Sequence, residues 1–227
     1  MHWEENSPAE AYTVPDTVVD GVFSISCRAL PVDHAYALSQ AIQRALPWFA
    51  SEAGAGLHLI HVAGSGNGWQ RPADPSALLQ LSRRTKLALR IPKQRIAAAS
   101  ALIGQTLDVG GHALHVDEIA LRPLSRITTL FSRHVLIATG QDEEGFLAAA
   151  ASQLGTLGIR PRKMLCGLTT PIATPARTLT TRSLMIAGLS PAESVLLQQQ
   201  GLGSERTLGC GLFLPHKDID DLRRRQE

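Results

Sequence analysis

The order of strand and helix patterns constrains the fold of this chain more than any other feature of its sequence. Apolar and polar residues alternate from Val22 to Ala29, which predicts a half-buried strand that ends before Pro31. Apolar residues then recur at three-and-four spacing from Ala37 to Phe49, which predicts an amphipathic helix over 34–49 with Asp33 as its cap. The chain is therefore expected to begin its fold as a strand followed directly by a helix.

The rest of the first half adds more strands and one more helix. Strands are predicted over 57–62 and 85–91, a short helix over 93–103, and two short strands within 106–121 that meet at a Gly110-Gly111 turn. The resulting order is β-α-β-β-α-β, which is the ferredoxin-like order.

The second half repeats this organisation less regularly. Strands are predicted over 128–139, 177–186 and 208–214, and helices over 142–157 and 190–200. Ser190, Pro191 and Glu193 have the spacing of a capping box, with the proline at the first helical position. We therefore predict an α+β protein of two tandem ferredoxin-like units: an N-terminal arm over 1–17, a first domain over 18–125 and a second over 126–227.

Composition excludes several classes of protein. The 227 residues are 44% hydrophobic, which excludes a disordered or fibrous chain, and the net charge of +2 excludes a uniformly basic nucleic-acid coat. Apolar stretches fall far short of the roughly 20 residues of a membrane span, and the polar N-terminus is unlike a signal peptide. We expect a cytoplasmic protein that binds no membrane. Three widely spaced cysteines without a CxxC motif favour free thiols over a disulfide framework or a zinc knuckle.

A glycine-rich segment lies between the last predicted helix and the last predicted strand. Gly201, Gly203, Gly209 and Gly211 surround Arg206. Exposed backbone amides and a guanidinium are suited to binding phosphate, although the same glycines also fit a helix stop and a turn. The segment is neither a Walker loop nor a dinucleotide fingerprint, because it lacks Gly-Lys-Ser/Thr and precedes a strand.

The C-terminal motifs follow one another in a characteristic order: Leu189-Ser190-Pro191-Ala192-Glu193-Ser194, Leu197-Gln198, Gly201-Leu202-Gly203, Arg206 and Gly209-Cys210-Gly211-Leu212-Phe213-Leu214-Pro215. This order resembles the signature of the CRISPR repeat-processing endoribonucleases of the RAMP superfamily, most of all the MYXAN subtype of the sixth Cas protein. Upstream, Leu30-Pro31-Val32-Asp33-His34 and Leu87-Ala88-Leu89-Arg90-Ile91-Pro92 keep the order of that subtype. The resemblance spans about residues 20–215.

The resemblance implies a fold of tandem ferredoxin-like units and a function in RNA processing. It implies cleavage of precursor CRISPR RNA within each repeat without a metal ion or other cofactor, by attack of the 2′-hydroxyl to leave a 2′,3′-cyclic phosphate. It also implies retention of the product, with other Cas proteins of an effector complex as partners. The alternative is a non-catalytic RAMP subunit that binds RNA and caps the 3′ hairpin of the CRISPR RNA.

Catalysis of this kind needs a base, an acid and a cation, and histidine titrates near working pH. His34 is the first candidate, because relatives place a catalytic histidine in or just after the first helix. Tyr36 is a phenol that could assist it, although helix packing also explains this residue. His61 could reach the cleavage site from the second strand. His58 and His61 would lie on opposite faces of that strand, so they predict no metal site.

A basic cluster occupies thirteen positions of the first domain and is the predicted RNA surface. Its members are Arg83, Arg84, Lys86, Arg90, Lys93 and Arg95. A solvated charged face remains the alternative. An aromatic content of 4% argues against a stacking platform for long single strands and favours a hairpin read by shape.

Overall fold

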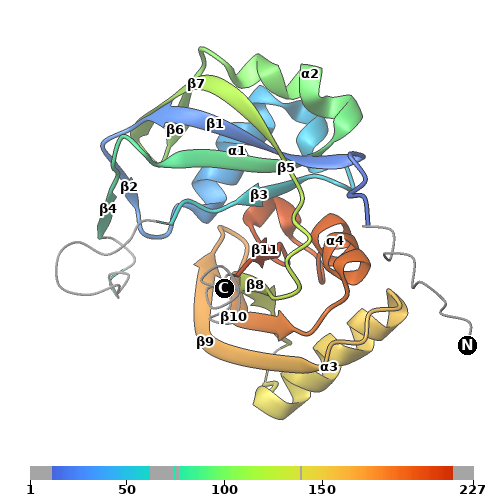
Figure 1. Cartoon of the computed structure of the whole chain (residues 1–227). Helices are drawn as coiled ribbons and strands as arrows, with labels where there is room; N and C mark the ends of the chain where they lie inside the picture. Colours follow the sequence, from blue (N-terminus) through green and yellow to red (C-terminus); the bar gives the residue numbers. More distant parts are fainter. Residues whose placement is uncertain (1–11, 62–73, 75–76, 139, 217–227) are drawn as a thin grey trace, which may run out of the picture.

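The computed structural model describes residues 12–61, 74, 77–138 and 140–216, which form two larger sheets with helices packed against them and one small two-stranded sheet (Figure 1). The first sheet has five strands in the order β3-β5-β1-β7-β6, and its pairings are antiparallel. These strands are β1 (Val18–Ser26), β3 (Gly56–His58), β5 (Lys86–Pro92), β6 (Thr106–Val109) and β7 (His112–Pro123). A separate two-stranded sheet, which the sequence analysis missed, pairs β2 (Ala29–Pro31) with β4 (Leu78–Gln80).

Two helical segments accompany the first sheet. α1 (Ala35–Ala45) ends earlier than predicted, and the 3-10 helix η1 (Pro47–Ala50) follows it. Leu46 leaves the helical conformation with φ −128° and ψ 80°, because the ring of Pro47 disfavours helix at the residue before it. The predicted helix over 93–103 is a short mixed run of η2 (Lys93–Arg95), α2 (Ile96–Ala99) and η3 (Ser100–Leu102).

The second sheet has four strands in the order β11-β8-β10-β9. They are β8 (Leu130–Leu136), β9 (Lys163–Ala173), β10 (Thr178–Ala187) and β11 (Leu214–Pro215), accompanied by α3 (Glu143–Thr156) and α4 (Pro191–Gln200). The capping box of α4 is confirmed: the Ser190 hydroxyl accepts from the Glu193 amide, and the Glu193 carboxylate accepts from the Ser190 amide. Asp142 caps α3 by accepting a hydrogen bond from the amide of Gly145.

One prediction for this half is wrong, and one strand was not predicted. The strand expected over 208–214 is replaced by the 3-10 helix η4 (Arg206–Leu208) and an irregular segment, and only β11 pairs with the sheet. Gly209 and Gly211 have φ of 86° and 67°, which no strand tolerates. The region before the strand predicted over 177–186 contains β9, an eleven-residue strand despite its glycine and proline.

The buried side chains form two clusters, one for each sheet. The first cluster also includes Ile172, Leu179, Leu208 and Cys210 from the second half of the chain, so the two units are packed together. Figure 1 shows α4 and β11 close to β3 and β5, where this contact lies. The mixed α+β fold of two units is therefore as predicted.

The proposed domain boundary at 125/126 falls in the connection between β7 and β8, and the division of the chain remains a prediction. Residues 1–11 of the proposed arm lie outside the described residues. No helix among the residues that the structure describes has the length and apolar character needed to cross a membrane.

Candidate active site

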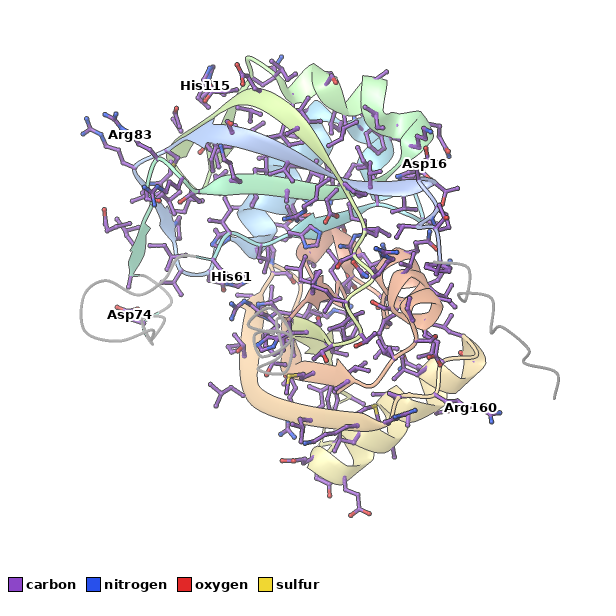
Figure 2. The ribbon with its side chains drawn as sticks, in the orientation of Figure 1. Asp16, His61, Asp74, Arg83, His115 and Arg160 are labelled. Carbon is purple, nitrogen blue, oxygen red and sulfur yellow. The ribbon has the colours of Figure 1, made fainter. Side chains whose placement is uncertain are left out.

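A pocket of about 190 Å³ lies where the two units meet. One wall comes from the segment that follows β3, a second from β8, and a third from the glycine-rich loop (residues 201–211) and the chain after it. The lining residues are His58, Leu59, His61, Phe131, Arg133, His134, Gly209, Leu212, Leu214, Pro215 and His216. Figure 2 labels His61 at this junction. The pocket thus gathers histidines from both halves of the chain.

Two of these histidines stack on one another across the junction. The ring centroids of His61 and His134 are 5.9 Å apart, and the ring planes differ by 18°. His61 is exposed, whereas His134 is only 4% exposed. One exposed and one buried imidazole from different units therefore face the same space.

A guanidinium and a further imidazole complete the polar lining. Arg133 is exposed, and its Cζ lies 5.6 Å from the centroid of the Phe131 ring. His216 contacts the same ring edge to face, with centroids 6.0 Å apart. The Phe131 ring thus supports the Arg133 cation at the mouth of the pocket.

His34, the first catalytic candidate, is 1% exposed and lies below this surface. Its Nδ1 donates to the carbonyl of Pro31 at 2.9 Å, and its Nε2 accepts from the amide of Ile60 at 3.2 Å. Both ring nitrogens are engaged, which requires a neutral ring. In this arrangement His34 fixes the backbone immediately before His61, and its expected proton-transfer role stays a prediction. The other candidate in this helix, Tyr36, packs against the first core.

Arg90 is also buried, with 0% exposure, and it does not reach an RNA-binding surface. It forms a two-pronged ion pair with Asp20, at 2.9 Å from Nε and 3.2 Å from Nη2. Its Nη1 donates to the carbonyls of Gln198 and Phe213, at 2.7 and 3.0 Å. The prediction for Arg90 is therefore corrected: it joins the first sheet to the second unit.

The Asp20 carboxylate also accepts from Arg122 at 3.1 Å and from His58 Nε2 at 3.1 Å. Burial acts to raise the pKa of Asp20, but the adjacent Arg90 guanidinium outweighs it and holds that pKa well below its usual range. Burial lowers the pKa of His58. His58 is therefore a neutral donor to Asp20 at neutral pH, at the floor of the pocket.

Arg206 serves the same structural purpose in the glycine-rich loop. Its guanidinium donates to the carbonyls of Gly54, Ala55, Gln199 and Gln200, at 3.3 Å for Gly54, 3.2 Å for Ala55 and 3.0 Å for Gln199. Burial lowers the pKa of Arg206 to about 10, so it is still charged at neutral pH. The expectation that Arg206 holds RNA is corrected, because its donors are used on the end of α4 and on the segment before β3.

The glycines of the loop allow close backbone packing rather than an open phosphate cradle. A Cβ on Gly201 would lie 2.6 Å from the Gly211 carbonyl oxygen, one on Gly209 2.5 Å from Leu59, and one on Gly211 2.0 Å from the Leu202 carbonyl oxygen. Loop amides donate to protein carbonyls, as Gly209 does to Arg206 and Gly211 to His134. The expected phosphate-binding role fits only the exposed Gly203. The loop instead builds a wall of the pocket and holds the backbone of His134.

The predicted basic cluster divides into two groups at opposite ends of β5. Lys93 pairs with Asp16, and Arg95 with Glu52. Arg83, Arg84 and Lys86 lie at the other end, where no carboxylate of the described residues pairs with them. Figure 2 shows Arg83 and Asp16 far apart. Because β3 is antiparallel to β5, the chain after β3 runs toward the Lys86 end, so this group lies on the His61 side.

Three of the polar side chains that line the pocket were not considered in the sequence analysis: Arg133, His134 and His216. The available signal was the histidine at 134 inside a predicted strand, on the same face as the buried Leu130 and Ser132. The three cysteines are free thiols. Among the described residues, no three His, Cys, Asp or Glu side chains gather as a metal ion would require.

Comparisons with known proteins agree with this architecture. The family model described as Cas6 Crispr matches residues 19–218. The CRISPR-associated endonuclease Cas6 of Myxococcus xanthus (strain DK1622) is 32% identical over 197 residues, which cover 87% of this chain and 81% of the relative.

Two solved structures share the fold. One is described as CRISPR associated protein Cas6, with a TM-score of 0.58 at 10% identity over 88% of this chain and 99% of that one. The other is described as an RAMP protein binding different RNA substrates, with a TM-score of 0.58 at 14% identity over 88% of this chain and 99% of that one. At these identities the two structures support the tandem α+β arrangement alone.

Proposed function

The chain belongs to the Cas6 family, and from this premise we propose that it is a metal-independent endoribonuclease that cleaves precursor CRISPR RNA within the repeat, in the pocket of His61, Arg133 and His134. The identified relative is named an endonuclease, and a protein of the same fold is described as binding RNA. The observation that carries the assignment of the site is the stacked pair of His61 and His134 beside an exposed guanidinium.

The proposed reaction needs only the RNA and these side chains. The 2′-hydroxyl oxygen attacks the adjacent phosphorus in line as a base removes its proton. The bond from phosphorus to the 5′-oxygen breaks as an acid donates a proton to that oxygen. The products are a 2′,3′-cyclic phosphate and a 5′-hydroxyl, with no net gain or loss of protons. Two imidazoles, one neutral and one protonated, can supply the base and the acid.

Arg133 is suited to stabilise the extra negative charge on the phosphorane. Its exposed guanidinium can donate two parallel hydrogen bonds to phosphate oxygens, and its position over Phe131 limits its freedom. Charge stabilisation by a fixed cation does not require a metal ion in this scheme.

The group of Arg83, Arg84 and Lys86 is the proposed track for the RNA backbone. It lies at the end of β5 toward which the chain runs as it approaches His61. Phosphate contacts from this group would position the hairpin, while the pocket receives the scissile phosphate. We further propose that the protein stays bound to its RNA product and becomes a subunit of an effector complex with other Cas proteins.

The test is incubation of the protein with its cognate repeat RNA in excess EDTA, beside a repeat that carries 2′-deoxyribose at the cleavage position. The proposal expects cleavage of the first RNA, a cyclic phosphate on its product, and no cleavage of the second. Cleavage of both RNAs, or activity only after a divalent ion is added, would contradict the mechanism.

The alternative function is a non-catalytic subunit that caps the 3′ hairpin of the CRISPR RNA. It predicts tight repeat binding in the same experiment with no cleavage of either RNA. The stacked histidines and the exposed Arg133 favour cleavage, because binding alone does not need an imidazole pair.

A further inference from the structure

Thr181 on β10 contacts His134, one of the residues that line the pocket. Its side chain is fully buried, at 0% exposure. Its Oγ1 is 2.7 Å from the carbonyl oxygen of Thr170 on β9 and 3.0 Å from Nδ1 of His134 on β8. One hydroxyl thus links the three strands β8, β9 and β10.

The hydroxyl hydrogen of Thr181 is committed to Thr170, since a carbonyl oxygen can only accept a hydrogen bond. The contact with His134 must therefore run the other way, with Nδ1–H donating to Oγ1 of Thr181. The neutral His134 ring then carries its hydrogen on Nδ1 and its lone pair on Nε2.

The backbone of His134 is fixed from a second direction. Its carbonyl accepts from the amide of Gly211 in the glycine-rich loop at 2.6 Å. The ring and the backbone of His134 are thus each fixed by a hydrogen bond, and the ring also stacks on His61 with the two centroids 5.9 Å apart. The tautomer and the orientation of His134 are both set before RNA arrives.

We propose that Thr181 is a positioning residue that holds His134 as the base of the cleavage reaction, with Nε2 as the atom that takes the proton. This inference rests on the proposed function. The 2′-hydroxyl proton passes to Nε2 as the new oxygen–phosphorus bond forms, and His61 gives its proton to the departing 5′-oxygen. His134 keeps its Nδ1–H bond to Thr181 in both states, so this bond does not rearrange when the ring becomes charged. Nε2 is buried in the structure, so RNA binding has to expose this atom before it can take the proton.

Other charged and titratable groups face this ring from both units. His58 and His61 line the pocket from the first unit, and Arg133 and His216 from the second. Among the described residues, none of these four side chains forms a hydrogen bond with Thr181. A substitution at Thr181 therefore affects His134 directly and the other four groups only through it.

The test compares Thr181→Val, which removes the hydroxyl, with Thr181→Ser, which keeps it. We expect Thr181→Val to lower the single-turnover cleavage rate about tenfold, because an Nδ1–H without an acceptor loses roughly one hydrogen bond. RNA affinity should not change, and Thr181→Ser should keep most of the wild-type rate. In Thr181→Val the charged His134 ring still carries an Nδ1–H that has lost its acceptor, whereas the neutral ring can shift its hydrogen to Nε2. The substitution should therefore lower the pKa of His134 and move the ascending limb of the pH–rate profile to lower pH.

A spectroscopic arm keeps the inference testable without catalysis. Long-range ¹H–¹⁵N spectra of the free wild-type protein, assigned with His134→Gln, should show neutral His134 as the Nδ1–H tautomer. An Nε2–H tautomer in that spectrum would overturn the inference, as would a Thr181→Val variant with the wild-type rate and pH profile. A wild-type protein that shows the Nδ1–H tautomer but cleaves no repeat RNA would refute the proposed function and with it the role as base, while upholding the tautomer assignment.

Discussion

Removal of the Arg206 guanidinium should destabilise the protein without weakening its contacts to RNA. The side chain donates to four backbone carbonyls, two at the end of α4 and two before β3. At about 1 kcal/mol net per hydrogen bond, loss of three to four bonds costs roughly 3–4 kcal/mol of unfolding free energy. For a chain of this size that corresponds to a fall in Tm of roughly 6–16 °C.

The assay is thermal unfolding followed by circular dichroism, with repeat-RNA binding measured on the same samples below the transition. Arg206→Lys is the matched variant, because it keeps the charge but a single ammonium cannot reach all four carbonyls. If Arg206 acts only through its bonds to backbone carbonyls, both variants have a lower Tm than the wild type, and the salt dependence of their RNA binding equals that of the wild type. An unchanged Tm in Arg206→Ala, together with a salt slope about one unit smaller, would show a phosphate contact and refute the reasoning.

Three more predictions concern other parts of the same structure. Asp20→Asn should lower the unfolding free energy by about 3–5 kcal/mol at neutral pH, because it leaves the buried Arg90 guanidinium without its charged partner. The pKa of the Asp20 carboxyl is depressed in the folded state, so the stabilisation it gives is present above the unfolded pKa of 3.8 and is lost as pH falls. In urea denaturation the variant should therefore lose less stability on acidification than the wild type, and equal losses would contradict this. Gly211→Ala should destabilise the fold and slow cleavage much more than Gly104→Ala. Both glycines have positive φ, but only a Cβ at Gly211 would lie against a backbone carbonyl. Equal Tm values for the two variants would count against a packing role for Gly211. Arg84→Ala should weaken repeat binding and reduce the salt dependence of the binding constant by about one unit of slope. Lys93→Ala should change neither quantity, because the Lys93 ammonium already pairs with the Asp16 carboxylate. Filter binding at several salt concentrations measures this contrast directly.

Local sequence patterns predicted the elements that depend on local rules. The alternation around Phe23 and the capping box at Ser190 both correspond to observed elements, since strand and helix termini are set by nearby residues. The final predicted strand failed because its apolar residues suggested extension while Gly209 and Gly211 adopt positive φ. An apolar run cannot show which conformation its glycines take.

The site was harder to predict because it depends on contacts between the two units. Lys86 and Arg90 lie on the same face of β5, so the strand pattern assigned both to the surface. Lys86 is exposed, whereas the second unit covers Arg90 with the carbonyls of Gln198 and Phe213. No pattern within a strand reveals what a second unit covers.

The histidines show the same limit. His34 was selected from its place at the start of the first helix, but tertiary contacts with Pro31 and Ile60 use both of its ring nitrogens. His134 lies about a hundred residues away from the first helix, and its partnership with His61 arises only when the units pack. The resemblance to a family identified the reaction, and the structure was needed to place its candidate residues.

The pocket is tested most directly by single-turnover cleavage of repeat RNA at saturating protein, with the wild type, His61→Ala, His134→Ala and His115→Ala. His115 is the matched control, because it is a half-buried histidine on β7 that Figure 2 shows well away from His61. The account predicts that His61→Ala and His134→Ala each lose about 100-fold or more in cleavage rate while RNA affinity is kept, and that His115→Ala cleaves like the wild type. Wild-type cleavage rates in both His61→Ala and His134→Ala would contradict the assignment of the reaction to this pocket.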